Sequence, residues 1–302
     1  MRLVMALGGN AILKRGEPMT IASQRLNVKS AAEAIAKVID AGHEVVITHG
    51  NGPQVGLMAL QDLAYDLALA SPIDCLVAET QGLIGYLLQQ ELSNATGGKK
   101  EFATILTQIE VNLADVAFNQ PSKPIGPLYN KSEAALMTGK YGWTMMPDGD
   151  HFRRAVPSPK PKRILEVNTI KLLLKNGLTT ICVGGGGIPV ALREGGNYSG
   201  VEAVIDKDHA SGLLARELKA DALLLLTDVD GVYVGWGTPQ QRRLATASPD
   251  LLRANTFASG SMAPKVEAAI DFVKGGGHMV GIGRLEDVFE ILERRAGTII
   301  AL

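Results

Sequence analysis

Strand-type apolar runs alternate with helical segments along most of this 302-residue chain. The first run, Leu3–Leu7, precedes a segment near 23–41 in which Leu26, Ala31 and Ile35 recur at helical spacing. Alternation of this kind over this length predicts a mostly parallel sheet covered by helices on both faces. We therefore expect an α/β fold, a three-layer αβα sandwich around a large, open and mostly parallel sheet.

The later elements keep this order. A strand is expected at Glu44–Thr48, a helix beginning at Pro53, and a long helix from Ser71-Pro72 to about Leu92. Further strands are expected at Thr104–Thr107, Thr179–Val183, Ala222–Thr227, Met279–Ile282 and Thr298–Leu302, and further helices near Ile164–Asn176, His209–Leu218, Lys265–Lys274 and Glu286–Arg295. A chain of this length can form one or two domains.

Residues 115–162 interrupt the alternation. They hold half of the chain's 14 prolines, together with Arg153 and Arg154, which we expect to be exposed. A disordered linker and a small protruding subdomain are both open at this point. A subdomain is favoured by aromatic side chains that could form its core: Tyr129, Tyr141, Trp143 and Phe152.

The composition excludes several classes of protein. A net charge of −1 gives no sign of a nucleic-acid or polybasic membrane surface, so we expect neither partner. The chain has no signal-peptide pattern and no apolar run of about 18 residues, which predicts a cytoplasmic location. Cys75 and Cys182 lie in apolar surroundings and are expected to be buried and inert. The five histidines lack metal-ligand spacing, so no protein-held zinc site is expected.

Glycines cluster where apolar runs end. The clusters are Gly8-Gly9, Gly50-Asn51-Gly52, Gly184–Gly187 and Gly231. Each could be a plain turn, because glycine tolerates backbone angles that turns need. Loops at the carboxyl ends of parallel strands, however, are where α/β proteins bind ligands, and they can direct backbone N–H groups at an anion. The repeated pattern favours a phosphate site.

Three lysines lie beside these loops or in the irregular segment. Lys207 is flanked by Asp206 and Asp208, Lys265 follows a Gly-Ser-Met-Ala-Pro string, and Lys123 lies between two prolines. A solvated surface position is the commoner fate of any single lysine. Phosphoryl transfer, however, requires compact positive charge, and a carboxylate between two lysines would hold both in place. Their placement therefore favours a phosphoryl-transfer site.

Together these residues resemble the carbamate kinases, within the amino-acid kinase superfamily. The resemblance covers essentially the whole chain, and His49–Gly56 (HGNGPQVG) is its most specific motif. The other motifs are Ala6–Ala11, Lys123–Pro127, Arg153–Pro159, Gly184–Pro189, Val204–Asp208, Thr227–Tyr233 and Gly260–Val266.

The resemblance implies reversible phosphoryl transfer between carbamoyl phosphate and ADP, giving ATP and carbamate with Mg²⁺. It implies a single domain, residues 1–302, with an acceptor lobe (1–190, including the subdomain at about 115–162) and a nucleotide-binding lobe (191–302), and it implies a homodimer. The implied catalytic residues are Lys123, Lys207, Asp208 and Lys265. The implied substrate- and phosphate-binding residues are Gly8, Gly9, Asn10, Gly50, Asn51, Gly52, Gly185 and Gly186, and the implied nucleotide-binding residues are Thr227, Asp228, Val229, Tyr233, Met262 and Pro264.

Two departures from the family pattern affect the nucleotide side. Ala263 stands where the family has glycine, and Gly235–Pro239 differs from the usual aromatic-Gly-Lys-Pro string. Two alternatives stay open: a superfamily kinase with a different carboxylate, phosphonate or UMP acceptor, and a non-catalytic nucleotide sensor. The resemblance suggests arginine metabolism, although agmatine or purine breakdown could supply the same carbamoyl phosphate.

Overall fold

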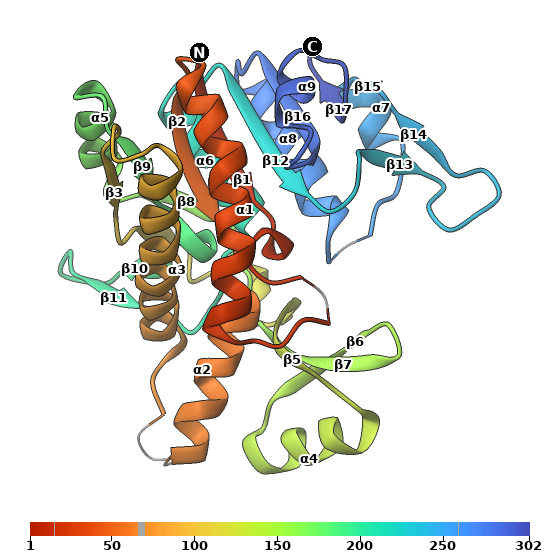
Figure 1. Cartoon of the computed structure of the whole chain (residues 1–302). Helices are drawn as coiled ribbons and strands as arrows, with labels where there is room; N and C mark the ends of the chain where they lie inside the picture. Colours follow the sequence, from red (N-terminus) through yellow and green to blue (C-terminus); the bar gives the residue numbers. More distant parts are fainter. Residues whose placement is uncertain (15, 66–69, 259) are drawn as a thin grey trace.

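An eight-stranded sheet forms the centre of the molecule in the computed structural model, which describes residues 1–14, 16–65, 70–258 and 260–302 (Figure 1). Its strands, in order across the sheet, are β15 (Thr246–Ala247), β17 (Thr298–Ile300), β16 (Met279–Arg284), β12 (Ala222–Thr227), β1 (Arg2–Leu7), β2 (Glu44–His49), β9 (Thr179–Ile181) and β3 (Phe102–Thr104). All neighbouring strands pair in parallel except β16 and β17.

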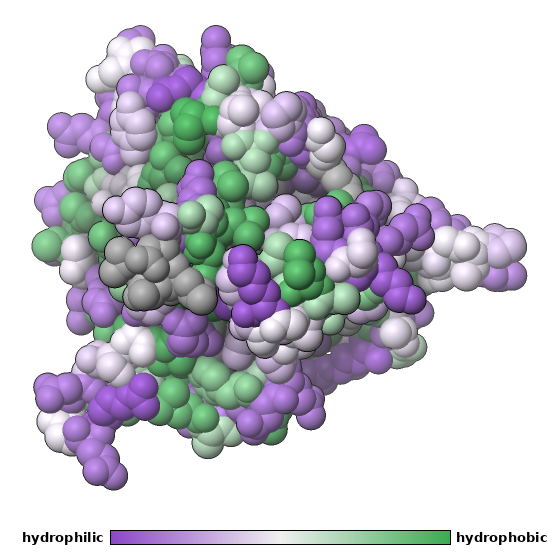
Figure 2. Space-filling view, turned by 90° about the horizontal axis from the view of Figure 1, so that it is seen from below, coloured by the Kyte–Doolittle hydropathy of each residue, from purple (hydrophilic) through white to green (hydrophobic). Residues whose placement is uncertain are grey.

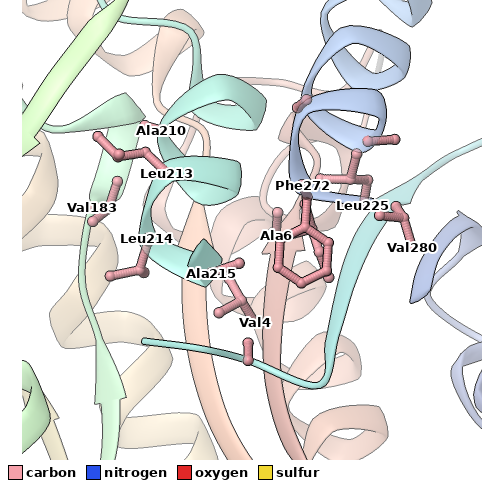
Figure 3. Packing of buried hydrophobic residues seen from close by; sticks show 14 of the residues in the cluster. Val4, Ala6, Val183, Ala210, Leu213, Leu214, Ala215, Leu225, Phe272 and Val280 are labelled. Atoms are coloured by element: carbon pink, nitrogen blue, oxygen red, sulfur yellow. The ribbon is translucent and has the colours of Figure 1, made fainter. Parts of the chain in front are cut away.

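Both faces of this sheet are buried. Successive residues of its central strands point to opposite sides, and the residues on each side pack against helices. Leu3 and Met5 pack on the face covered by α1 (Ile21–Asp40), α3 (Ile73–Ala95) and α9 (Val288–Leu292). The opposite face is covered by α5 (Val167–Lys175), α6 (Lys207–Glu217) and α8 (Met262–Lys274). Figure 3 shows the core on that face, where Val4 and Ala6 of β1 lie with Ala215 and Phe272. The expected three-layer α/β sandwich is confirmed.

A second, four-stranded sheet lies beside the main one. Its order is β11 (Tyr198–Gly200), β10 (Ile188–Leu192), β4 (Gln108–Val111) and β8 (Pro161–Ile164). Farther along the chain, β13 (Val232–Val234) and β14 (Arg242–Leu244) form a hairpin whose connection projects from the body, and α7 (Pro249–Arg253) follows it (Figure 1).

The proline-rich segment folds into a protruding subdomain. It consists of the antiparallel strands β5 (Lys123–Tyr129), β7 (His151–Val156) and β6 (Thr144–Asp148) with α4 (Lys131–Tyr141), and it projects from the body in Figure 1. The expected aromatic side chains contribute to it: Tyr129 is buried, and the rings of Tyr141 and Trp143 are 5.2 Å apart. The alternative of a disordered linker is therefore excluded.

One expected strand is wrong, and one expected helix is confirmed with a later start. No strand spans Thr104–Thr107, because β3 ends at Thr104 and the chain then crosses to the second sheet, where β4 begins at Gln108. The expected helix near Ile164–Asn176 begins later, at Val167, because Ile164 belongs to β8 and pairs with Ile109 of β4.

Some exposure predictions are also wrong. Cys182 is buried as expected, but Cys75 is exposed near the start of α3. Leu26 of α1 points to solvent with 70% exposure, because it lies outside the apolar stripe that packs on the sheet.

Arg153 and Arg154 are half-buried rather than exposed. Arg153 donates to the carbonyl oxygen of Gly126, and Arg154 lies over the ring of Trp143.

The surface carries hydrophilic and hydrophobic residues side by side, as Figure 2 shows for the side seen from below. Among the described residues, no helix is long and apolar enough to cross a membrane.

The subdomain joins the body through a contact between two glycines. Gly56 of α2 (Gly52–Tyr65) lies so close to Gly126 of β5 that a Cβ atom built on Gly56 would come within 1.8 Å of the Cα atom of Gly126. Only backbone atoms are available to move at this point. The absence of a side chain on Gly56 therefore sets how closely the subdomain approaches α2.

A Gly56→Ala variant tests this contact. The added methyl group must push β5 away from α2, and overpacking of this kind lowers the free energy of unfolding by about 1–3 kcal/mol. Chemical denaturation measures the loss. Gly82→Ala on α3 is the matched control, because a Cβ atom there meets no heavy atom within 4 Å, and we expect unchanged or slightly raised stability. Equal stability of the Gly56 and Gly82 variants would contradict the proposed role of the contact.

Candidate active site

The carboxyl ends of the central strands lie at one edge of the main sheet. Leu7 of β1 is paired with His49 of β2 on one side and with Leu226 of β12 on the other, and Thr227 is paired with Arg284 of β16. The loops that follow these strands therefore begin side by side. This is the edge at which open α/β sheets bind ligands.

The first two glycine loops are in contact. Gly8 donates its N–H to the carbonyl oxygen of Leu226 (2.9 Å), and Gly9 begins a short 3₁₀ turn that ends at Ala11. A Cβ atom on Gly50 would lie 3.7 Å from the backbone nitrogen of Gly9. The structure thus brings together the two strand ends that the sequence placed about forty residues apart.

The third glycine loop packs on the second. Gly184–Gly186 form a buried 3₁₀ turn, in which Gly185 has φ +65°. A Cβ atom on Gly185 would come within 2.0 Å of the side-chain nitrogen of Asn51, and one on Gly186 within 2.1 Å of the carbonyl oxygen of Ile205. Glycine is therefore required here both for its backbone conformation and for close approach.

The side-chain amide of Asn51 is itself engaged in this packing. Its nitrogen donates to the hydroxyl of Thr80 (2.8 Å), and the residue is buried. The side chain of Asn51 therefore fixes the Gly50–Gly52 loop on α3. Gly52 begins α2 next to the subdomain: a Cβ atom built on Gly52 would lie 3.8 Å from the carbonyl oxygen of Pro124.

Gln81 of α3 supports the Gly184–Gly186 loop, a role that was not predicted from the sequence. Its amide nitrogen donates to the carbonyl oxygen of Gly184 (2.9 Å), and its amide oxygen accepts from the N–H of Thr107 (2.8 Å). A glutamine among the apolar residues on the buried side of α3 could have indicated this role.

A charge cluster, defined as Lys207, Asp208 and Lys265, lies at the beginning of α6. One carboxylate oxygen of Asp208 is 2.9 Å from the Lys207 ammonium nitrogen, and the other is 3.0 Å from that of Lys265. The three side chains are between 5% and 12% exposed. The expectation of a carboxylate between two lysines is confirmed.

Burial and pairing compete in this cluster. Burial disfavours the charged form of Asp208, but the two ammonium groups more than offset it and hold its pKa well below the usual range. The pKa of Lys207 is lowered, because desolvation outweighs its attraction to Asp208 and Lys265 repels it. The pKa of Lys265 is raised, because Asp208 outweighs the effect of burial. Asp208 is thus an ionised anchor for two cations.

Lys123 reaches this region from the subdomain. Its ammonium nitrogen is 2.5 Å from a carboxylate oxygen of Asp206. The other oxygen of Asp206 caps α6 by accepting from the N–H groups of Asp208 (2.8 Å) and His209 (3.3 Å). Asp206 therefore connects Lys123 to the charge cluster. The sequence placed Asp206 beside Lys207 but gave no indication of its partnership with Lys123.

Five of the six expected nucleotide-binding residues line a cavity of about 350 Å³. Its walls include Thr227, Asp228, Val229, Tyr233 and Met262, with Lys265 at one end. Pro264 is not among the lining residues, although it lies one residue from Lys265 on α8.

An adjacent cavity of about 780 Å³ is lined by the first glycine loop. Gly8, Gly9 and Asn10 face it, and Asp228 and Lys265 line both cavities. Asn10 donates its side-chain amide to Asp228 (2.7 Å), so the first glycine loop is tied directly to the nucleotide side. The arrangement can hold an elongated polyanion that passes Lys265, the member of the charge cluster that lines both cavities.

His49 is buried beside the Gly184 loop and is held neutral. Its Nδ1 atom lies 3.1 Å from the carbonyl oxygen of Gly50. Burial lowers its pKa to about 4, and the nearby Lys207 acts in the same direction. A neutral ring adds no positive charge to the site, which fits an orienting role rather than a catalytic one.

A His49→Gln variant tests this assignment through the pH dependence of stability. The unfolded chain protonates His49 below about pH 6.5, whereas the folded protein resists protonation down to about 4, so wild-type stability falls as pH falls through this window. His49 accounts for up to about 3 kcal/mol of that fall. Denaturation of both proteins between pH 7 and 4 should show a shallower slope for the variant. Parallel slopes would contradict the assignment.

Comparisons with known proteins agree with this geometry. The sequence profile of the "Amino acid kinase family" matches residues 1–283. The chain is 52% identical to a carbamate kinase from Haemophilus influenzae (99% of this chain, 96% of the relative) and 50% identical to one from Rhizobium meliloti (100% and 93%). A solved carbamate kinase from Giardia lamblia bound to AMP-PNP is 40% identical, with a TM-score of 0.89 over 99% of this chain and 98% of that one. The chain therefore belongs to the amino acid kinase family and, within it, to the carbamate kinases.

Proposed function

We propose that this protein transfers a phosphoryl group reversibly between carbamoyl phosphate and ADP, giving carbamate and ATP. The charge cluster carries the proposal, because one buried carboxylate holds two lysines together and one of them, Lys265, lines both the nucleotide cavity and the cavity of the first glycine loop. Phosphoryl transfer depends mainly on positioning and on neutralising the charge of the migrating group. The similarity of the chain to carbamate kinases supports carbamate as the acceptor over another carboxylate, a phosphonate or UMP.

In the proposed mechanism, a β-phosphate oxygen of ADP attacks the phosphorus atom of carbamoyl phosphate. The bond between phosphorus and the carbamoyl oxygen breaks, and its electron pair leaves with carbamate. Lys207 and Lys265 neutralise the oxygens of the migrating group, and Asp208 keeps the two ammonium groups in place. Lys123 exchanges its partner Asp206 for the substrate. The reverse reaction follows the same contacts.

We propose that the nucleotide base lies in the 350 Å³ cavity and that its phosphate chain extends into the 780 Å³ cavity, where it meets the acceptor. We assign the acceptor to residues 1–190, where Gly8, Gly9 and Asn10 line the 780 Å³ cavity. The Gly50–Gly52 loop lies next to Gly9, and the Gly184–Gly186 loop packs on Asn51. We assign the nucleotide to residues 191–302, where the walls of the 350 Å³ cavity accept its base and ribose.

Mg²⁺ is proposed to arrive with the nucleotide. Within residues 1–14, 16–65, 70–258 and 260–302, no cluster of three His, Cys, Asp or Glu side chains could hold a metal ion. Mg²⁺ usually needs only one or two protein carboxylates besides the phosphates, and Asp228 lines both cavities, so the residues fit this mode of binding. When bound, the ion offsets charge on the nucleotide phosphates.

The resemblance also supports a homodimer and a cytoplasmic location. We propose both, and light scattering on the purified protein tests the first by its mass in solution. A mass near 32.0 kDa would contradict the homodimer.

A coupled assay for ATP formed from ADP and carbamoyl phosphate tests the proposed function. We expect turnover with Mg²⁺ and none with EDTA. No ATP formation, with turnover of acetylglutamate or another acid, would contradict the proposal, and so would nucleotide binding without consumption of any acyl phosphate.

In the same assay, Lys207→Ala should lower kcat by about 10³-fold or more, because one of the two cations that stabilise the transition state is lost. Lys207→Met, which keeps the side-chain volume, should show the same loss, and thermal unfolding checks that both variants fold. Lys29→Ala on the exposed side of α1 is the control and should retain wild-type kcat. A kcat near wild type in either Lys207 variant would remove Lys207 from the mechanism.

A further inference from the structure

Arg284 lies at the edge of the main sheet formed by the carboxyl ends of the central strands, and it belongs to none of the sequence motifs. It ends β16, and its Cα atom is paired with that of Thr227, the last residue of β12. The loop that carries the expected nucleotide-binding residues therefore starts beside Arg284. Because the two strands are parallel, both ends open on the ligand side of the sheet.

The guanidinium group of Arg284 is free to take a ligand. The residue is exposed, and no hydrogen bond or ion pair joins its side chain to any residue in the described part of the chain. Arg243, by contrast, donates to the carbonyl oxygen of Asp230 on the nearby loop. Within the described part of the chain, Arg284 therefore has no hydrogen bond or ion pair to break when it binds a ligand.

Arg284 lines one of the two cavities and is paired with Thr227, which lines both. It lines the 780 Å³ cavity together with Asn10, Thr227, Asp228 and Lys265, three of which also line the nucleotide cavity. It also acts on Tyr233 of the nucleotide cavity: a hydrogen bond to Asp230 raises the pKa of that hydroxyl, and Arg284 is one of the cations that oppose the rise.

The wall of the 780 Å³ cavity carries mixed charge. Lys14, Arg153, Lys265 and Arg284 line it together with the carboxylates Asp228, Glu286 and Asp287. Glu286 and Asp287 follow Arg284 closely in the chain, and both would repel a phosphate chain in this cavity. A guanidinium group offsets that charge, and its planar set of N–H donors matches two phosphate oxygens at once.

We propose that Arg284 is a nucleotide-binding residue that contacts the phosphate chain of ADP and ATP. The inference rests on the proposed function, since it takes the substrate to be a nucleoside diphosphate. Arg284 acts on binding, while the charge cluster acts on transfer. Its removal should therefore weaken the affinity for ADP much more than it lowers kcat.

Calorimetry on Arg284→Ala, with ADP and adenosine as separate titrants, tests the proposal. Loss of a charge-assisted contact to phosphate should raise the Kd for ADP by about tenfold and leave the Kd for adenosine unchanged. Arg284→Lys should recover part of the loss, because it keeps the charge without the planar donor set. Arg295→Ala is the control, since Arg295 is an exposed arginine beyond α9 that pairs with Glu293, and it should bind ADP as the wild type does.

Unchanged ADP affinity in Arg284→Ala would overturn the proposal. So would an equal loss of affinity for ADP and adenosine, which would place Arg284 at the base or ribose or in a purely structural role. Neither result depends on turnover of carbamoyl phosphate. A wild-type protein that binds ADP but fails in the coupled assay would therefore contradict the proposed function alone.

Discussion

The carboxylate of Asp208 lies between two ammonium groups in a nearly solvent-free position, and the rest of the site is arranged around this contact. A buried carboxylate without such partners would be strongly disfavoured, and so would two lysines this close to each other without it. With Lys123 and Asp206 the region holds three cations and two carboxylates, which leaves one positive charge in excess. A phosphoryl group entering the site would meet that charge, already fixed in position.

The fold supplies this arrangement through the order of its strands. Parallel strands end at one edge, so loops that are far apart in sequence surround one space. Backbone packing then sets the distances, because the Gly184 loop fits against Asn51 and Ile205 only without side chains. The subdomain adds Lys123 through the contact of Gly56 with Gly126. This edge of the sheet thus combines four separate segments: the loops after β1, β2 and β9, and the subdomain.

Much of this was predictable from the sequence. Apolar periodicity predicted the central strands and helices, and glycine clusters after strands predicted the ligand edge. The flanking of Lys207 by acidic residues predicted the paired carboxylate, which is a local feature. The predictions failed where contacts between distant parts of the chain determine the local structure. The chain leaves one sheet for another between Thr104 and Gln108, and no local pattern marks that crossing.

Long-range partners were equally hidden. Lys123 and Asp206 are 83 residues apart, and their ion pair depends on where the subdomain docks. The exposure of Cys75 depends on which side of α3 meets the sheet. Arg284 follows an ordinary apolar strand, so only the pairing of β16 with β12 reveals that it lies at the functional edge.

Steady-state kinetics of an Asp208→Asn variant would show whether phosphoryl transfer depends on the carboxylate between Lys207 and Lys265. The amide keeps the shape of the side chain but cannot hold two ammonium groups by charge. We expect kcat for ATP formation to fall by about 100-fold or more, while the Kd for ADP stays within about threefold of the wild type. A variant that folds normally and turns over at the wild-type rate would contradict the account, because the lysines would then act without the carboxylate between them.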